Sequence, residues 1–194
     1  MSESTRWMQW WAHPWSHAHP DWPDGGLAGW PHEHVHAMAR NQHARAAKAF
    51  AIEPCLPCRP FPALLYLAFA QSSQQDFVLA LVDHTCRPSR PTCLNAEQQL
   101  GCQRLAKALR AHTWLEQKDD PLQLLRAWVE PAIWQRLRLR FACPRIMALE
   151  HHPVLSISPT KLQAFWQAII WRAMDGTTST HHTEAHDHAG ATQD

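Results

Sequence analysis

Apolar residues recur every three or four positions along much of the chain, the spacing that places them on one face of an α-helix. The clearest stripe follows Ser158 and Pro159, which suit the start of a helix, and consists of Leu162, Phe165, Trp166, Ile169, Ile170 and Ala173. The same spacing predicts helices over residues 32–50, 61–71, 75–84, 95–117 and 120–129. We expect the helix opened by Asn95 to be the longest, since Gln98 completes a capping box.

Two segments do not fit a simple helical pattern. Four prolines lie close together in residues 51–62, so this stretch is predicted to be a connection. Residues 135–141 alternate Arg136, Arg138 and Arg140 with apolar neighbours. Strict alternation is typical of a strand, yet Trp134, Leu137 and Phe141 also fit a helix, so both conformations stay open.

The two ends of the chain differ from its middle. Residues 1–31 hold six of the 11 Trp among Pro, Gly and His without a period, which predicts an irregular arm packed by aromatic side chains. Residues 176–194 are rich in Thr, His and Asp, and this composition predicts a disordered tail. Between them, residues 32–175 are expected to form one helical domain.

Composition favours the same fold class. Leu and Ala dominate the apolar residues, while the β-branched residues that strands prefer are few. A length of 194 residues suits a single domain. We therefore predict an all-α protein: a single irregular domain of helices punctuated by the 15 Pro, with a Trp-rich arm and a His-rich tail.

Charge and hydropathy exclude several classes of function. Lys and Arg number 18 against 17 Asp and Glu, so the chain lacks the basic excess that nonspecific nucleic-acid binding needs. The longest apolar stretch, residues 61–70, is far shorter than the ~20 residues that span a bilayer. The first residues do not resemble a signal peptide. We expect a cytoplasmic protein that binds no nucleic acid and inserts into no membrane.

One short motif suggests zinc chemistry. His32, Glu33 and His36 satisfy H-E-x-x-H, in which two His on one helical face hold zinc and the Glu polarises bound water. The extended motif continues with a Gly and a third His, but Ala39 and Gln42 stand at those positions. A zinc-dependent metallopeptidase is therefore the alternative hypothesis, and the absence of a complete site favours a protein without catalytic residues, metal or cofactor.

Cysteines and the terminal histidines offer weaker metal candidates. Cys55 and Cys58 form a C-x-x-C pair, but no second pair stands at a comparable spacing, so two thiols in a tight loop is the simpler interpretation. Four His in the tail could bind a transition metal loosely, at positions His181, His182, His186 and His188.

The densest basic cluster consists of Arg136, Arg138 and Arg140, with Arg126 and Arg145 nearby. Whether this segment is a strand or a helix, we expect at least two guanidinium groups to face solvent, where they could bind an acidic partner surface. A solvated polar face is the alternative interpretation of the same residues.

The segment around this cluster resembles a known family. Asp120-Pro-Leu-Gln-Leu-Leu-Arg-Ala-Trp128, then Pro131 and Trp134-Gln-Arg-Leu-Arg-Leu-Arg-Phe141, looks like the C-terminal part of SctK-type proteins, the Hrp-type cytosolic accessory subunits of bacterial type III secretion systems. The resemblance covers about 25 residues. A chain length near two hundred and an early His13-Pro14 among aromatic residues also fit it.

This resemblance implies a non-enzymatic, mainly helical subunit of the cytosolic sorting platform. Such a subunit would bridge the SctD-type inner-membrane ring protein and the SctQ-type pod protein, peripheral to the membrane. The candidate partner-binding residues are Trp128, Trp134, Arg136, Arg138 and Arg140.

Overall fold

A computed structural model describes residues 2–22 and 43–183, with side chains up to residue 175. Within these ranges the chain forms helices joined by loops and contains no strand, so the predicted all-α class is confirmed. No helix in the described part of the chain combines the length and the apolarity needed to cross a membrane.

The described residues divide into two compact units, and each is built from two separate stretches of chain. Unit 1 comprises Met1–Phe69 and Leu122–Ser156, and unit 2 comprises Ala70–Pro121 and Ile157–Asp194. The domain boundaries expected after residues 31 and 175 do not coincide with this division.

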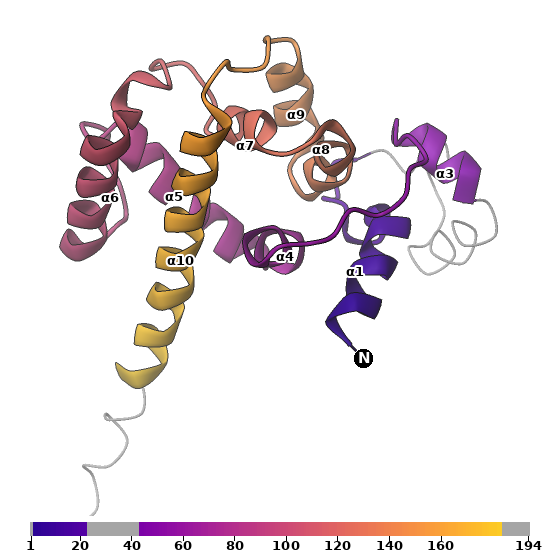
Figure 1. Ribbon diagram of the computed structural model, residues 1–194, viewed down its shortest axis with the longest axis horizontal. Helices are drawn as coiled ribbons and strands as arrows, with labels where there is room; N and C mark the ends of the chain where they lie inside the picture. The colour runs from indigo at the N-terminus through magenta and orange to yellow at the C-terminus, as the bar shows by residue number, and fades with distance from the viewer. Residues whose placement is uncertain (1, 23–42, 184–194) are drawn as a thin grey trace, which may run out of the picture. The chain divides into compact units, whose positions relative to one another are not determined.

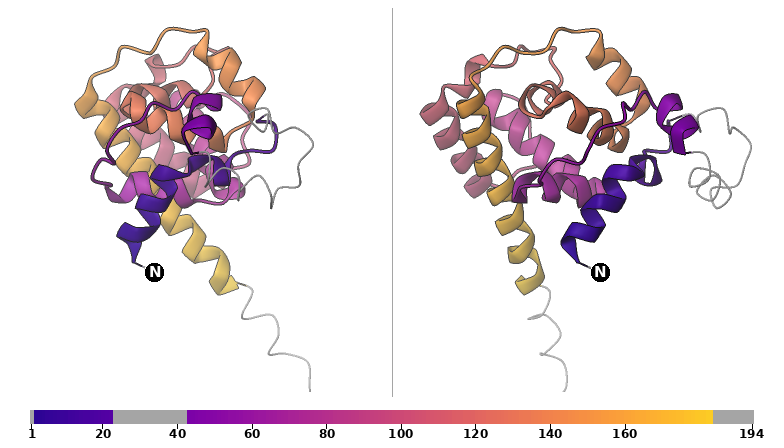
Figure 2. Two further views of the ribbon diagram at one scale, coloured as in Figure 1. Left: turned by 90° about the vertical axis from the view of Figure 1, so that its right-hand side faces the viewer. Right: turned by 45° about the vertical axis from the view of Figure 1, so that its right-hand side comes forward.

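Unit 2 consists of three helices that each contact the other two: α5 (Ser72–Cys86), α6 (Ala96–Leu109) and α10 (Pro159–Thr183). They lie side by side in Figure 1 and in the right-hand view of Figure 2. A short 3-10 helix, η2 (Ala111–Thr113), follows α6 and contacts both α5 and α6.

The apolar stripe of α10 forms much of the core of unit 2. All six predicted residues are buried, and Phe165 and Trp166 have no exposed surface. The Trp114 ring packs against Phe165, with ring centroids 5.3 Å apart and ring planes tilted by 56°. α10 continues past Gly176 to Thr183, so the predicted disordered tail begins too early. Residues 184–194 lie outside the described part of the chain, and their predicted disorder stays a prediction.

The capping box predicted at the start of α6 is present. Asn95 Oδ1 accepts a hydrogen bond from Gln98 N and Gln98 Oε1 accepts one from Asn95 N, both at 2.9 Å. The expected end near residue 117 is wrong, because Arg110 adopts a left-handed conformation with φ 58° and ends the helix after Leu109. α10, with 25 residues, is therefore longer than α6, with 14.

Unit 1 contains shorter helices: α1 (Glu3–Ala12), η1 (Pro14–His17), α3 (His43–Ala49), α4 (Pro62–Phe69), α7 (Leu122–Trp128), α8 (Pro131–Leu137), η3 (Arg138–Arg140) and α9 (Cys143–Glu150). The irregular conformation predicted for the N-terminal arm is wrong for α1 (Figure 1). Ser2 caps this helix, since its Oγ accepts a hydrogen bond from Thr5 N at 3.2 Å. Trp7, Trp10 and Trp11 are spaced as on one helical face, and all three are buried.

The ambiguous segment 135–141 is helical. α8 runs through Leu137 and η3 continues through Arg140. The alternation misleads because both of its classes point inward: Leu137 and Leu139 are buried, and so are Arg136 and Arg138. Alternating residue types therefore do not mark alternating inner and outer faces here.

Candidate functional site

The N-terminal tryptophans form a continuous aromatic cluster in unit 1. The ring centroids of Trp7 lie 5.0 Å from Trp10 and 5.6 Å from Trp11. Trp10 also meets the ring of Phe69 at 6.5 Å, and the Arg6 guanidinium lies 4.0 Å from the centroid of that ring. These contacts fix α1 against α4 through aromatic packing rather than through an aliphatic stripe.

Two of these indoles hold the C-x-x-C loop. Trp11 Nε1 donates to the carbonyl oxygen of Cys55 at 3.2 Å, and Trp7 Nε1 donates to that of Cys58 at 3.0 Å. The loop between α3 and α4 therefore lies along α1 (Figure 1). Because no regular element supplies partners for these carbonyls, the indole N–H groups satisfy them and fix the loop.

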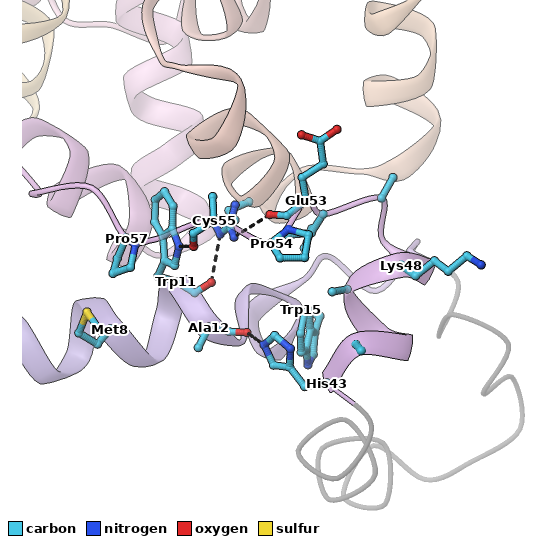
Figure 3. Close-up of a pocket in the computed structure, with 15 residues that line it drawn as sticks. Met8, Trp11, Ala12, Trp15, His43, Lys48, Glu53, Pro54, Cys55 and Pro57 are labelled. Carbon is cyan, nitrogen blue, oxygen red and sulfur yellow. Dashed lines mark hydrogen bonds between the residues drawn. The ribbon is translucent and has the colours of Figure 1, made fainter.

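A pocket of about 800 Å³ opens between α1, α3 and this loop. Its walls are mainly apolar or aromatic and include Met8, Trp11, Trp15, Ile52 and Pro57. Figure 3 shows Trp11 beside Cys55 and Trp15 beside α3. We refer to this cavity as the unit 1 pocket.

Two polar side chains that line the unit 1 pocket, His43 and Arg136, contact backbone carbonyls. The His43 ring Nε2 lies 2.7 Å from the carbonyl oxygen of Ala12. Arg136 Nε donates to Trp11 O at 3.1 Å and its Nη1 donates to Ala132 O at 2.8 Å. With these two groups engaged and walls that are mainly apolar or aromatic, the pocket suits binding of an apolar or aromatic group.

Arg136 forms part of the wall and is itself buried, with 4% of its surface exposed. Its guanidinium carbon lies 4.1 Å from the centroid of the Trp11 ring. Burial lowers the pKa of the Arg136 guanidinium, and the nearby Cys55 and Cys58 thiols act in the opposite direction. Arg136 is therefore not one of the solvent-facing guanidinium groups that the sequence predicts, because its donors bind carbonyls inside unit 1. Its contact with a partner stays a prediction.

Arg138 is buried in the same way, with 7% of its surface exposed. Its Nη1 donates to Glu150 Oε2 at 2.8 Å and its Nη2 donates to Phe50 O at 2.8 Å. Trp134, also buried, donates from Nε1 to Glu150 Oε1 at 2.7 Å. One carboxylate of α9 thus joins two of the residues expected to contact a partner.

The other two candidate partner-binding residues are half-buried. Arg140 Nη1 lies 3.4 Å from the carbonyl oxygen of His17, and burial lowers the pKa of its guanidinium. The Trp128 ring packs edge-on against Phe61, with centroids 5.4 Å apart. The predicted face with at least two solvent-exposed guanidinium groups is therefore absent, since Arg136 and Arg138 are buried and Arg140 is only partly accessible.

The same segment also binds the N-terminal chain through its backbone. His19 N donates to Leu139 O at 2.7 Å, and Trp22 Nε1 donates to Phe141 O at 2.8 Å. The Arg138 guanidinium carbon lies 5.4 Å from the centroid of the Trp22 ring. The N-terminal segment therefore packs against residues 136–141.

Cys55 and Cys58 are free thiols, the first exposed and the second half-buried. Burial is the main cause that raises the pKa of the Cys58 thiol, and the charge of Glu130 adds to it. Within the ranges that the structure describes, no group of three or more His, Cys, Asp or Glu side chains is placed to hold a metal ion.

Several predicted candidates cannot be placed. His32, Glu33 and His36 lie outside the described residues, as do His186 and His188. His181 and His182 belong to α10, but only their backbone is described.

The pocket walls themselves were missed by sequence reasoning. The sequence does contain a signal for one wall: Trp7, Trp10 and Trp11 follow the three- and four-residue spacing of a helix, and Ser2 upstream is suited to cap that helix. No comparable sequence pattern predicts the hydrogen bonds that the indole and guanidinium groups donate to carbonyl oxygens far away in the sequence.

Comparison with known proteins identifies no relative. No protein-family model matches the chain, and no curated protein and no solved structure is significantly similar to it.

Proposed function

We propose that this protein is a non-enzymatic subunit of the cytosolic sorting platform of a bacterial type III secretion system. It would bridge the SctD-type inner-membrane ring protein and the SctQ-type pod protein, on the cytoplasmic side of the membrane. Its action would be to hold two partners together rather than to transform a substrate.

The observation that carries this proposal is the segment 120–141, on which the resemblance rests. This segment becomes α7, α8 and η3, and its characteristic Trp and Arg residues support unit 1 from within. The residues that carry the resemblance therefore have structural roles in this chain. The resemblance implies a mainly helical subunit, and the described part of the chain is all-α.

The corrected position of the arginines changes where a partner would bind. Buried guanidinium groups cannot form a docking face, so we propose that other, exposed residues of unit 1 supply contacts to a partner. Leu56 is 90% exposed and Met8 is 52% exposed, and both lie at or next to residues that line the unit 1 pocket. Exposed apolar side chains beside an apolar pocket are suited to protein contacts.

Co-purification tests this proposal. The chain would be co-expressed with the cytoplasmic domain of the ring protein and with the pod protein from the same genome, and complexes would be separated by size-exclusion chromatography. We expect both partners to co-elute with the chain. Recovery of neither partner would contradict the proposal.

Matched variants locate the contact. Met8→Asp with Leu56→Asp is expected to lower recovery of at least one partner. Met147→Asp with Val154→Asp also replaces two exposed apolar residues of unit 1, a Met and a Val that are 49% and 52% exposed, and is expected to leave recovery unchanged. An equal loss of partner recovery in both double variants would show that Met8 and Leu56 are not a specific contact site for the partners.

The metallopeptidase alternative has its own measurement. A zinc enzyme using His32, Glu33 and His36 requires one zinc ion per chain, and replacement of either His by Ala should remove it. Elemental analysis of the purified protein decides this point: stoichiometric zinc that depends on both His would favour the alternative over the proposed scaffold.

A further inference from the structure

A second hollow lies on unit 2, along the outer side of α6. This α6 groove has a volume of about 850 Å³ and is lined by Pro88, Leu100, Ala106, Arg104, Lys107 and Arg110, among others. Leu100 is 46% exposed although it is a large apolar residue within a helix. The groove therefore offers apolar surface that the described part of unit 2 does not cover.

The charges of the α6 groove all have one sign. Arg104, Lys107 and Arg110 are exposed, and no Asp or Glu lines the groove. Among the described residues no ion pair joins these three cations to a carboxylate, whereas Lys118, another exposed cation of unit 2, lies 3.5 Å from Glu116. In a chain with a net charge of only +1, this local excess is distinctive.

The end of α6 explains part of this charge. A helix C-terminus carries partial negative charge, so cations in the last turn are favourable there. This accounts for Lys107 in the last turn and for Arg110 at the C-cap. It does not account for Arg104, which lies more than a turn before Leu109, nor for the exposed Leu100 beside it.

The three cations form a row rather than a single convergent site. Arg104 and Lys107 stand three residues apart, about 4.5 Å along the axis of α6 at 1.5 Å per residue, and Arg110 follows at the C-cap beyond the last helical residue. A single phosphate would need donors that converge on one point, whereas a row matches carboxylates repeated along an elongated ligand. Because Leu100 and Pro88 lie beside these cations in the groove, the ligand also needs apolar groups beside its carboxylates.

We propose that the α6 groove binds an acidic amphipathic helical segment of a partner protein. Leu or similar residues of that segment would cover Leu100, Pro88 and Ala106, and its Asp or Glu residues would face Arg104, Lys107 and Arg110. The proposal rests on the geometry and charge of unit 2 and does not depend on a role in secretion.

A binding measurement with defined probes tests it on the full chain. The first probe is a fluorescein-labelled helical peptide of about three heptads with Leu on one face and Glu at the flanking positions. The second is the same peptide with Lys in place of Glu, and the third is a labelled DNA duplex. Fluorescence anisotropy gives the affinity for each.

We expect the acidic peptide to bind more tightly than the other two probes. Its affinity should fall as the salt concentration rises from about 50 mM to about 300 mM. Arg104→Glu with Lys107→Glu should weaken it by roughly tenfold and should improve binding of the basic peptide. Lys118→Glu with Lys161→Glu makes the same change in net charge at exposed positions of unit 2 outside the groove and should have little effect.

Leu100→Ser separates the apolar contribution from charge. This variant is expected to bind the acidic peptide with lower affinity, while the salt dependence of that affinity stays the same. No binding of the acidic peptide, an equal loss in both double variants, or tighter binding of the DNA duplex would each overturn the proposal. Since neither secretion partner is present, such a failure would leave the co-purification test of the proposed function unaffected.

Discussion

The two units of this protein reach a buried core by different means. In unit 2 the helix α10 buries an aliphatic and aromatic stripe, and α6 begins with a complete capping box. In unit 1 short helices are joined by indole and guanidinium groups that reach backbone carbonyls far away in sequence, such as Arg136 to Trp11 and Trp11 to Cys55. The first design depends on periodic apolar burial, and the second depends on side chains that are partly apolar and partly polar.

This difference predicts where substitutions act and through which kind of contact. In unit 2 the loss of apolar volume should have the largest effect. In unit 1 the loss of a single donor should matter even where the apolar volume is kept. The following predictions test this contrast in order of expected size.

The largest effect is expected in the core of unit 2. Trp166→Ala removes a side chain with no exposed surface and should lower the free energy of unfolding by about 3–5 kcal/mol. Trp171→Ala changes the same residue type on the same helix at a position that is 63% exposed, and should cost less than about 1 kcal/mol. Urea denaturation measures the free energy of unfolding of both variants. Equal losses would contradict the burial of the α10 stripe in the core of unit 2.

A somewhat smaller effect is expected from the ion pair of unit 1. Arg138→Met leaves Glu150 without its cationic partner and leaves Phe50 O without its donor, so we expect a loss of about 3 kcal/mol. The same substitution at the exposed Arg59 should change the free energy of unfolding by less than about 0.5 kcal/mol. A double variant that also carries Glu150→Gln should lose less than the sum of the two single variants, since the unpaired charge is gone.

Alkaline pH should weaken unit 2 through a buried thiol. Burial raises the pKa of Cys86 from 9.0 to about 12. Between these two values the unfolded chain releases a proton that the folded chain keeps, so stability falls as pH rises. The loss should reach about 1.4 kcal/mol at pH 10.

The Cys86→Ala variant isolates this contribution. Its free energy of unfolding should fall less steeply between pH 8 and pH 10 than that of the wild type, whatever its stability at neutral pH. Cys93→Ala, at an exposed thiol, should keep the wild-type slope. Identical slopes for all three proteins would show that Cys86 ionises normally in the folded chain.

The smallest effect separates two neighbouring tryptophans of α1. Trp11→Phe removes the donor to Cys55 O and should cost about 1 kcal/mol beyond the loss of ring area. The buried Trp10 Nε1 has no hydrogen-bond partner in the described part of the chain, so Trp10→Phe loses only ring area. Thermal or urea unfolding should therefore rank Trp11→Phe as more destabilising, although Trp10 is the more buried residue.

The same contrast explains how far the sequence predicts the structure. The α10 stripe and the Asn95–Gln98 capping box are local, periodic signals, and both predictions are confirmed. The orientation of Arg136 and Arg138 was not predictable, because a guanidinium can face solvent or bind carbonyls, and its partners here are up to 125 residues away in sequence. The end of α6 was missed because a non-glycine residue, Arg110, takes the left-handed conformation.

The candidate site shows the same limit. Sequence patterns single out the C-x-x-C loop and the segment 134–140 only as separate features. Only the fold brings Cys55 and Arg136 to the wall of one pocket with Trp11. Whether that pocket receives a secretion partner stays a proposal.

The central claim is that the arginines of residues 136–138 belong to the interior of unit 1 and do not form a docking face. Modification of the native protein with phenylglyoxal, read residue by residue by mass spectrometry, tests it most directly. We expect Arg104 and Arg110, which are exposed on α6, to be modified readily. Arg136 and Arg138 should be protected until the protein is unfolded in urea; modification of these two residues in the native protein at the rate of Arg104 would contradict the claim.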